Sequence, residues 1–159
     1  MRIDPRFDRN YTFLQERFNQ ITITKEDFSL LYTISKSNID TRIIKGINIP
    51  NYIRLSAAKN SSIRFNIVDL ACYMTGMELD NAMKHTLLYN YLYNKYGTVI
   101  LTRKIFAYEL KISLGTLSTH LKKNKDYLPI FQKGKKKNSP VYFNISDVAD
   151  YLLKTVKTL

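Results

Sequence analysis

Apolar residues recur at helical spacing in a segment near the start of each half of the chain. In the second half this segment lies between Asp80, a suitable N-cap, and Gly97, a suitable C-cap. Its apolar residues share one stripe: Leu88, Leu92 and Tyr96. In the first half Leu14 and Phe18 form the matching stripe, and Asp8 is the expected N-cap. The pattern predicts an amphipathic helix at the start of each half.

Short strands and a second set of helices are expected after these segments. Runs of β-branched residues at 21–23 and 99–101 predict strands, and Thr24 or Thr102 follows as the N-cap of another helix. Further along, apolar segments on either side of a polar loop predict a hairpin in each half: 52–55 with 63–65, and 130–132 with 141–143.

The segments after the hairpins show that the chain repeats itself. Residues 65–74 and 143–152 are identical at six of ten positions, with an offset of 78 residues. In both, an asparagine (Asn66 or Asn144) comes three residues before an aspartate, which is typical of a helix N-terminus. A period of this length predicts two copies of one small fold rather than a solenoid. The expected units are two: residues 1–79 and residues 80–159.

The segment 102–121 has the pattern of two helices joined by a tight turn. Ala107 is small where the helices would cross, Leu110 is the next apolar residue, and Ile112 fills the turn. Ser113 is the expected N-cap of the second helix. The buried side of that helix is expected at Leu117 and Leu121. The first unit has suitable residues at the equivalent places: Ser29, Tyr32, Ile34, Ser35, Ile39 and Ile43. A left-handed cap is expected after each second helix, at Gly46 and Asn124.

The complete order of helix-turn-helix, two-stranded hairpin and closing helix resembles the winged-helix domains of the excisionase-like and MerR-type group. The resemblance covers about residues 24–74 and 102–152. It implies a mainly α fold with small β-wings (α+β), made of two tandem winged helix-turn-helix domains. The family often has glycine at the position of Lys111. Such domains place the second helix of the motif in a major groove of double-stranded DNA.

Charge favours a polyanionic partner, with nucleic acid first and an anionic membrane second. The formal net charge is +12, of which +3 falls in residues 1–79 and +9 in residues 80–159. We therefore expect the second unit to attract polyanions more strongly. The single cysteine, Cys72, excludes a disulfide within the chain and fits a reducing compartment. We expect neither a signal peptide in residues 1–9 nor a membrane-spanning segment.

In the second unit, the outward face of the second helix and the hairpin loop are the expected DNA contacts. Hydroxyl groups can reach base edges or phosphates, glycine allows close approach, and lysines contact the backbone or guanine. The lysine-rich loop fits phosphates or a narrow minor groove, although a solvated hairpin tip would have the same composition. The expected DNA-binding residues here are Ser113, Gly115, Thr116, Ser118, Thr119, Lys122, Lys123, Lys133, Lys135, Lys136, Lys137 and Asn138.

In the first unit the equivalent surface has a more mixed character. Asp40 would repel phosphate, although it can accept a hydrogen bond from cytosine, and Ile44 could meet thymine methyl groups or a protein. Two functions therefore stay open for this unit: DNA binding, and docking or dimerisation. The expected DNA-binding residues here are Ser37, Asn38, Thr41, Arg42, Lys45, Arg54, Lys59 and Arg64.

We expect no enzyme activity, no cofactor and no metal site. His85 and His120 are far apart in the sequence, and no spacing of His, Cys, Asp and Glu resembles a metal site. Cys72 fits a small core residue better than a nucleophile. His120 flanks the second helix of the motif, where a phosphate contact and a packing role are both open.

The sequence thus favours a cytoplasmic, nucleoid-associated, sequence-specific double-stranded DNA-binding protein that regulates transcription. Two alternatives keep DNA as the partner: a recombination directionality factor, and a replication or partition protein of a mobile element. A third alternative is a tandem winged-helix module that binds proteins and not DNA. An RNA-binding role lacks the aromatic-on-strand signatures of the common RNA modules. A homodimer or another DNA-bound protein partner also stays open.

Overall fold

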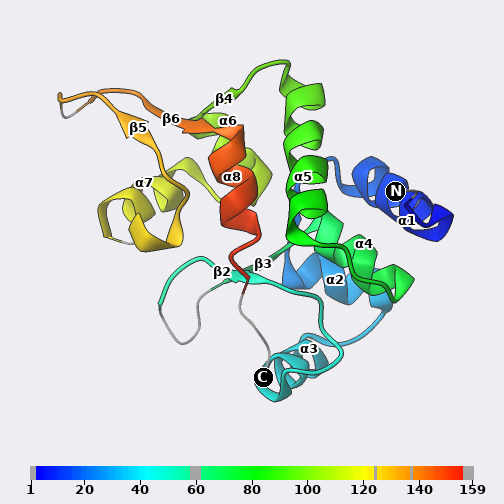
Figure 1. Cartoon of the computed structure of the whole chain (residues 1–159). Helices are drawn as coiled ribbons and strands as arrows, with labels where there is room; N and C mark the ends of the chain where they lie inside the picture. The colour runs from blue at the N-terminus through cyan, green and yellow to red at the C-terminus, as the bar shows by residue number, and fades with distance from the viewer. Residues whose placement is uncertain (1–2, 58–61, 124, 137, 156–159) are drawn as a thin grey trace.

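The computed structural model describes residues 3–57, 62–123, 125–136 and 138–155 as a mainly helical chain with two small antiparallel sheets (Figure 1). This confirms the α+β class. The first half contains α1 (Pro5–Phe18), β1 (Thr22–Ile23), α2 (Lys25–Tyr32), α3 (Lys36–Lys45), β2 (Ile53–Arg54), β3 (Ile63–Asn66) and α4 (Ile67–Thr75). The second contains α5 (Asn81–Tyr96), β4 (Ile100–Thr102), α6 (Arg103–Leu110), α7 (Leu114–Lys123), the 3-10 turn η1 (Lys125–Tyr127), β5 (Gln132–Lys133), β6 (Val141–Asn144) and α8 (Ile145–Leu152).

The two halves have the same order of elements, apart from η1, and the same strand order. The sheets run β1-β3-β2 and β4-β6-β5. Thr22 is opposite Asn66 in the first sheet, and Ile100 is opposite Asn144 in the second. Each residue of the second pair lies 78 positions after its counterpart in the first pair, which is the offset that the sequence shows. In each half the first and last helices pack together, α1 on α4 and α5 on α8.

Helix caps follow the local sequence closely. The side chain of Thr24 accepts a hydrogen bond from the amide of Asp27, and Thr102 does the same for Ile105, as the sequence predicts. The predicted N-caps Ser35, Asn66, Asp80 and Asn144 and the C-caps Gly46 and Gly97 are also confirmed. Asn124, expected as a further cap, lies outside the described residues.

Two local predictions need correction. The N-cap of α1 is Asp4 rather than Asp8, because Pro5 fits the first helical position and Asp4 accepts from the amide of Arg6. The strand expected at 130–132 begins only at Gln132, and the Ile130 side chain is 72% exposed. Lys111 has a positive φ of 56°, a backbone conformation that glycine would adopt with less strain.

The joint between the halves is built around a buried glutamate, Glu109 at the end of α6. One carboxylate oxygen accepts from the amide of Ile21 at 3.0 Å. The other accepts from Lys95 Nζ at 2.8 Å and from the hydroxyl of Tyr96 at 2.7 Å. The Thr22 hydroxyl donates to the Glu109 backbone carbonyl at 2.7 Å. Charged and polar groups on both sides are therefore satisfied without water.

Arg64, expected to contact DNA, belongs to this joint instead. It is only 8% exposed, and its guanidinium donates to the carbonyls of Leu110 at 2.8 Å and Lys111 at 2.9 Å. Burial lowers the pKa of the guanidinium from its usual value. The prediction that Arg64 binds DNA is wrong, because docking of the second half covers this strand and uses the arginine to cap the end of α6.

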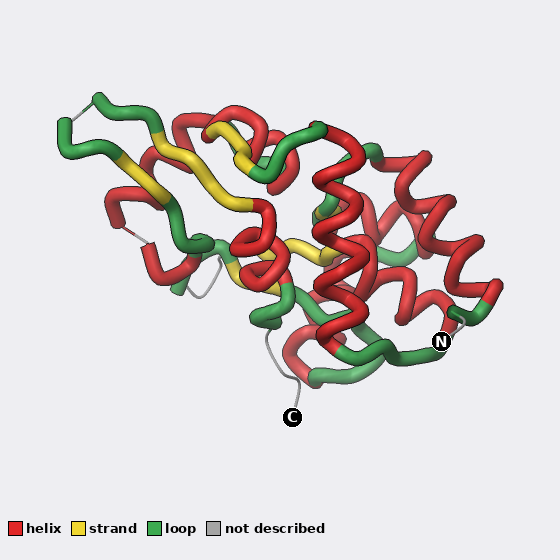
Figure 2. The backbone as a smooth tube through the Cα atoms, turned by 45° about the horizontal axis from the view of Figure 1, so that its top comes forward, coloured by secondary structure: helices red, strands yellow, loops and turns green. Residues whose placement is uncertain are grey.

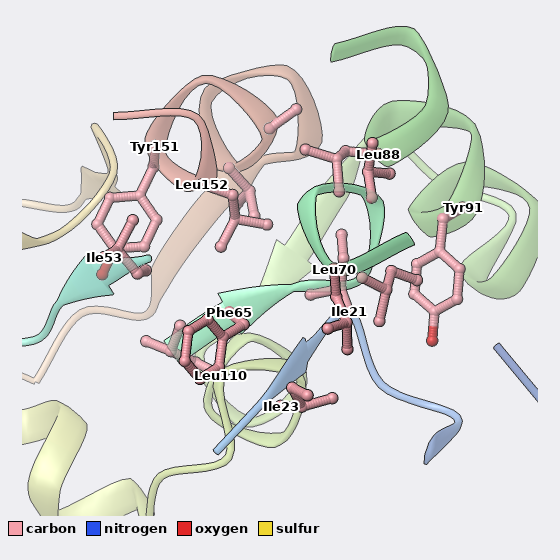
Figure 3. Packing of buried hydrophobic residues seen from close by; sticks show 14 of the residues in the cluster. Ile21, Ile23, Ile53, Phe65, Leu70, Leu88, Tyr91, Leu110, Tyr151 and Leu152 are labelled. Carbon is pink, nitrogen blue, oxygen red and sulfur yellow. The ribbon is translucent and has the colours of Figure 1, made fainter. Parts of the chain in front are cut away.

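One apolar cluster continues through both halves. Figure 3 shows Tyr151 of α8 beside Ile53 of the first half, and Leu110 of α6 beside Phe65. A buried ion pair between Lys84 of α5 and Asp69 of α4, at 2.7 Å, adds a further link. None of the described helices is long and apolar enough to cross a membrane.

Two tyrosines in this region, the half-buried Tyr96 and the buried Tyr151, should respond in opposite ways to loss of their hydroxyl groups. Tyr96 donates to Glu109, so Tyr96→Phe should lower the free energy of unfolding by about 2 kcal/mol. The Tyr151 hydroxyl is buried without a partner among the described residues, so Tyr151→Phe should raise that free energy by up to about 1 kcal/mol. Urea unfolding measures both, and a loss above about 1 kcal/mol for Tyr151→Phe would show that its hydroxyl is satisfied.

Candidate nucleic-acid interface

Helix α7 presents a polar, exposed face because its N-terminal end and its buried side are fixed locally. The Ser113 hydroxyl accepts from the amide of Thr116 at 3.0 Å and starts the helix, as predicted. Leu117 is fully buried, which turns the opposite side outward. Ser118 is half-buried, and the other predicted contacts on and before the helix are exposed: Ser113, Gly115, Thr116, Thr119, Lys122 and Lys123.

The loop between β5 and β6 projects from the body on the same side as α7 (Figures 1 and 2). A Cβ atom on Gly134 would lie 2.6 Å from the Ser139 hydroxyl oxygen, so this position needs glycine for the two sides of the loop to approach. The amide of Ser139 donates to the carbonyl of Lys136 at 3.0 Å and closes the turn. The predicted contacts Lys133, Lys135, Lys136 and Asn138 are exposed, and Lys137 lies outside the described residues.

The structure adds two cations that the predicted set lacks, Arg103 and Lys104 at the start of α6. Both are exposed, and Arg103 Nη1 lies 3.5 Å from the Ser118 hydroxyl on α7. In the sequence, the feature that could have identified them is that they form a basic pair directly after the N-cap Thr102. A basic first turn opposes the helix dipole, so these residues cost stability unless an anion compensates them.

Charge pairing differs between this face and its counterpart on α3. In the first half Lys25 forms an ion pair with Asp40 at 3.0 Å, and Lys36 forms one with Glu26 at 3.0 Å. The residues that correspond to Lys25 and Asp40 in the second half are Arg103 and Ser118, so the acid is missing there. Within the described ranges, no ion pair involves Lys122, Lys123, Lys133, Lys135 or Lys136. The second half therefore has the stronger uncompensated positive charge.

The α3 face forms a shallow hollow of about 370 Å³. Arg42 is fixed at its edge, because its Nε donates to Asn38 Oδ1 at 2.8 Å and its Nη1 to the carbonyl of Asn48 at 3.1 Å. The hollow is lined by five of the predicted contacts: Ser37, Asn38, Thr41, Arg42 and Lys45.

The remaining predicted residues of the first half do not join this hollow. Arg54 is half-buried, with its guanidinium 5.8 Å from the centre of the Tyr52 ring, and Lys59 lies outside the described residues. Arg64 is buried in the joint between the halves.

Cysteine and histidine, the other residue types that could be reactive, lie in positions where they pack against or contact neighbouring residues. Cys72 is buried, and burial raises the pKa of its thiol to about 11, so little thiolate forms at neutral pH. His85 contacts Ser146 and Asp150 of α8. In the part of the chain that the structure describes, no group of three or more His, Cys, Asp and Glu side chains could hold a metal ion.

Comparison of the chain with protein-family models, with curated proteins and with solved structures found no match.

Proposed function

We propose that the chain is a sequence-specific double-stranded DNA-binding protein made of two tandem winged helix-turn-helix units, and that it regulates transcription. The observation that carries the proposal is the pairing of two features on one side of the second half. The exposed face of α7 and the β5–β6 loop both present lysines without a carboxylate partner among the described residues. A polyanion would compensate this charge.

In this proposal α7 is the recognition helix and lies in a major groove. Ser118 and Thr119 face base edges, while Lys122 and Lys123 near its C-terminal end contact phosphates. The β5–β6 loop is the wing, and its lysines contact phosphates beside the groove or enter the minor groove. Arg103 and Lys104 extend the phosphate contacts to the start of α6.

The hollow on α3 is the second contact in this proposal. Asn38 and Arg42 can read base edges or phosphates, but the ion pairs of Lys25 and Lys36 leave less charge for the DNA backbone. Tandem units can reach successive major grooves on one side of the duplex, about 34 Å apart. Because the two faces differ, the preferred site is asymmetric rather than palindromic.

One observation supports protein binding by the α3 face as a second candidate. The Ile44 side chain is 85% exposed and that of Ile47 is 54% exposed, and both belong to the region of the paired lysines. Apolar exposure beside neutralised charge suits a protein contact better than a phosphate contact. This candidate leaves the function of α7 and the wing unchanged.

Selection of bound sites from a random duplex library tests the proposal. The wild-type chain should select a defined asymmetric sequence, and Ser118→Ala with Thr119→Ala should shift the preferred bases at one cluster of positions. Retention of the same preferred sequence with uniformly weaker binding would mean that these hydroxyls only position the domain. A library with no enrichment for the wild type would contradict sequence-specific binding.

Gly115 offers a separate test, because its surroundings do not require glycine. A Cβ atom there would meet only the Ser113 hydroxyl oxygen, at 3.9 Å, and Gly115 is exposed in the first turn of α7. Gly115→Ala should therefore raise the free energy of unfolding by about 0.5–1 kcal/mol. It should also weaken specific DNA binding, because the methyl group keeps the helix away from the groove. Urea unfolding and anisotropy titration measure the two effects, and unchanged affinity would place DNA elsewhere.

A further inference from the structure

The joint between the halves joins two different surfaces. The first half contributes β1, an edge strand of its sheet, with Arg64 of β3, and the second half contributes the end of α6. In a two-fold arrangement each contact would occur twice with the residues exchanged. Here Arg64 contacts the carbonyls of Leu110 and Lys111, whereas its counterpart Tyr142 is 40% exposed. The joint is therefore heterologous, and each half keeps one half-interface unused.

The two unused surfaces follow from the offset of 78 residues. The free strand face consists of the counterparts of Ile21, Thr22 and Arg64, which are Val99, Ile100 and Tyr142. The free helix face consists of the counterparts of Tyr108, Glu109 and Leu110, which are Leu30, Leu31 and Tyr32.

Exposure separates the used surfaces from the free ones. Ile21 is 1% exposed in the joint, but its counterpart Val99 is 40% exposed. Glu109 is 1% exposed, and its counterpart Leu31 is only half-buried. Leu30, next to it, is 76% exposed. Both free surfaces therefore expose apolar area at the positions where the internal joint is closed.

The two free faces differ from the joint in the same way, because apolar or aromatic residues replace polar ones at their central positions. The joint is polar, with the Glu109 carboxylate accepting from Lys95, Tyr96 and the amide of Ile21. On the free helix face the counterpart of Glu109 is Leu31, and on the free strand face the counterparts of Thr22 and Arg64 are Ile100 and Tyr142. Polar groups face each other inside the joint, whereas Leu31 on one free face and Ile100 on the other are apolar, with the ion pair of Asp27 and Lys111 beside Leu31. This match supports a partner with the same geometry.

The free helix face contains a cavity at the position that corresponds to the contact of Ile21 with Glu109 in the joint. In the joint, Glu109 accepts from the amide of Ile21 and from the side chains of Lys95 and Tyr96. The corresponding place on the first half is an open cavity of about 370 Å³. Its lining contains the three counterparts Arg17, Phe18 and Leu31, together with Leu30, Asp27 and Lys111. Lys111 of the second half borders the cavity, where its Nζ pairs with Asp27 at 2.6 Å and lies 5.3 Å from the centre of the Phe18 ring.

We propose that the occupant of the free helix face is the free strand face of a second copy of this chain, with Val99 entering the cavity. The contact repeats the internal joint, so copies add head to tail and form an open array rather than a closed dimer. The proposal goes beyond DNA binding and does not depend on it. On a duplex, the array would place successive copies side by side, and only this consequence rests on the proposed function.

Sedimentation velocity without DNA tests the proposal with two surface variants. The wild-type chain should show mass that rises with concentration through dimer and larger species, up to about 1 mM, which is the effective concentration that a short covalent link supplies. Leu30→Arg breaks only the helix face, and Val99→Arg breaks only the strand face. Each variant alone should stay monomeric. An equimolar mixture should form a dimer and stop there, because Val99→Arg supplies the helix face and Leu30→Arg the strand face.

Ile44→Arg is the matched control, because this isoleucine is exposed but belongs to neither free face. It should associate like the wild type, and circular dichroism should show all three variants folded. A wild-type chain that stays monomeric over the whole range overturns the proposal. So does a mixture of Leu30→Arg and Val99→Arg that forms no dimer, since that result fits a two-fold contact or a different surface. Neither result bears on DNA affinity, which is measured separately.

Discussion

Replacing Lys133, Lys135 and Lys136 with alanine is expected to weaken binding to random duplex DNA by about ten- to a hundred-fold near 0.1 M salt. The three side chains are exposed on or beside the β5–β6 loop, and no ion pair to a described residue compensates them. Each phosphate contact that is lost should also reduce the slope of log affinity against log salt by about 0.9. Anisotropy titrations at several salt concentrations measure both changes.

A variant with the same loss of charge elsewhere provides the control. Arg6 and Arg9 lie on α1, at the other end of the molecule from α7 in Figure 1, and the third control residue, Lys154, is exposed just after α8. Their replacement with alanine should leave the salt slope close to that of the wild type. Equal effects of the two triple variants would mean that only net charge matters and that the loop does not contact DNA. The loop variant should keep the wild-type unfolding midpoint, because the three lysines contribute little to packing.

The second large effect is expected for stability, from Arg64→Ala. This change should lower the free energy of unfolding by about 3 kcal/mol, because it removes buried charge-assisted hydrogen bonds and leaves two carbonyls at the end of α6 unpaired. Urea unfolding of the full chain measures it. Arg9→Ala, on an exposed position of α1, should change stability by less than about 0.5 kcal/mol. A loss for Arg64→Ala as small as that of the control would show that the joint does not depend on this arginine.

Local structure could be predicted from the sequence where a few neighbouring residues decide it. Thr24, Thr102 and Ser113 cap helices because each hydroxyl accepts from an amide only three residues further on. The register of β1 on β3 could also be anticipated from the repeat, since the offset of 78 residues carries Thr22 and Asn66 to Ile100 and Asn144. The outer strands depart from the offset, because Ile53 is opposite Arg64 whereas Gln132, and not Phe131, is opposite Tyr142. Asp8 was the wrong cap for α1 because Pro5, whose fixed φ suits the first turn, moves the start of the helix to an earlier residue.

Tertiary contacts between the halves could not be predicted in this way. Arg64 is a cation on a hairpin strand, which by itself indicates a DNA contact. Only the docking of α6 against that strand makes it a buried structural residue. Glu109 is one of five acids in residues 80–159, and no local pattern distinguishes it, yet it organises the joint. Glu109 contacts Ile21 and Thr22, which are 88 and 87 positions away in the sequence, and no local pattern encodes such contacts.

The candidate interface lies between these two cases. The exposed face of α7 follows from the buried position of Leu117, so helical periodicity was sufficient to predict Thr119 and Lys122 there. Arg103 was missed because its proximity to Ser118 depends on how α6 and α7 cross. The neutralising pairs of Lys25 and Lys36 were missed for the same reason, since their acids come from the neighbouring helix.

A salt titration of the full chain on random duplex DNA measures whether the lysines of the second half bind DNA. We expect measurable binding near 0.1 M salt and a log–log slope steeper than about −4, because at least five uncompensated lysines share one side of the second half. Absence of binding at that salt concentration, or a slope close to zero, would rule out DNA binding by this surface and favour a chain that binds proteins alone.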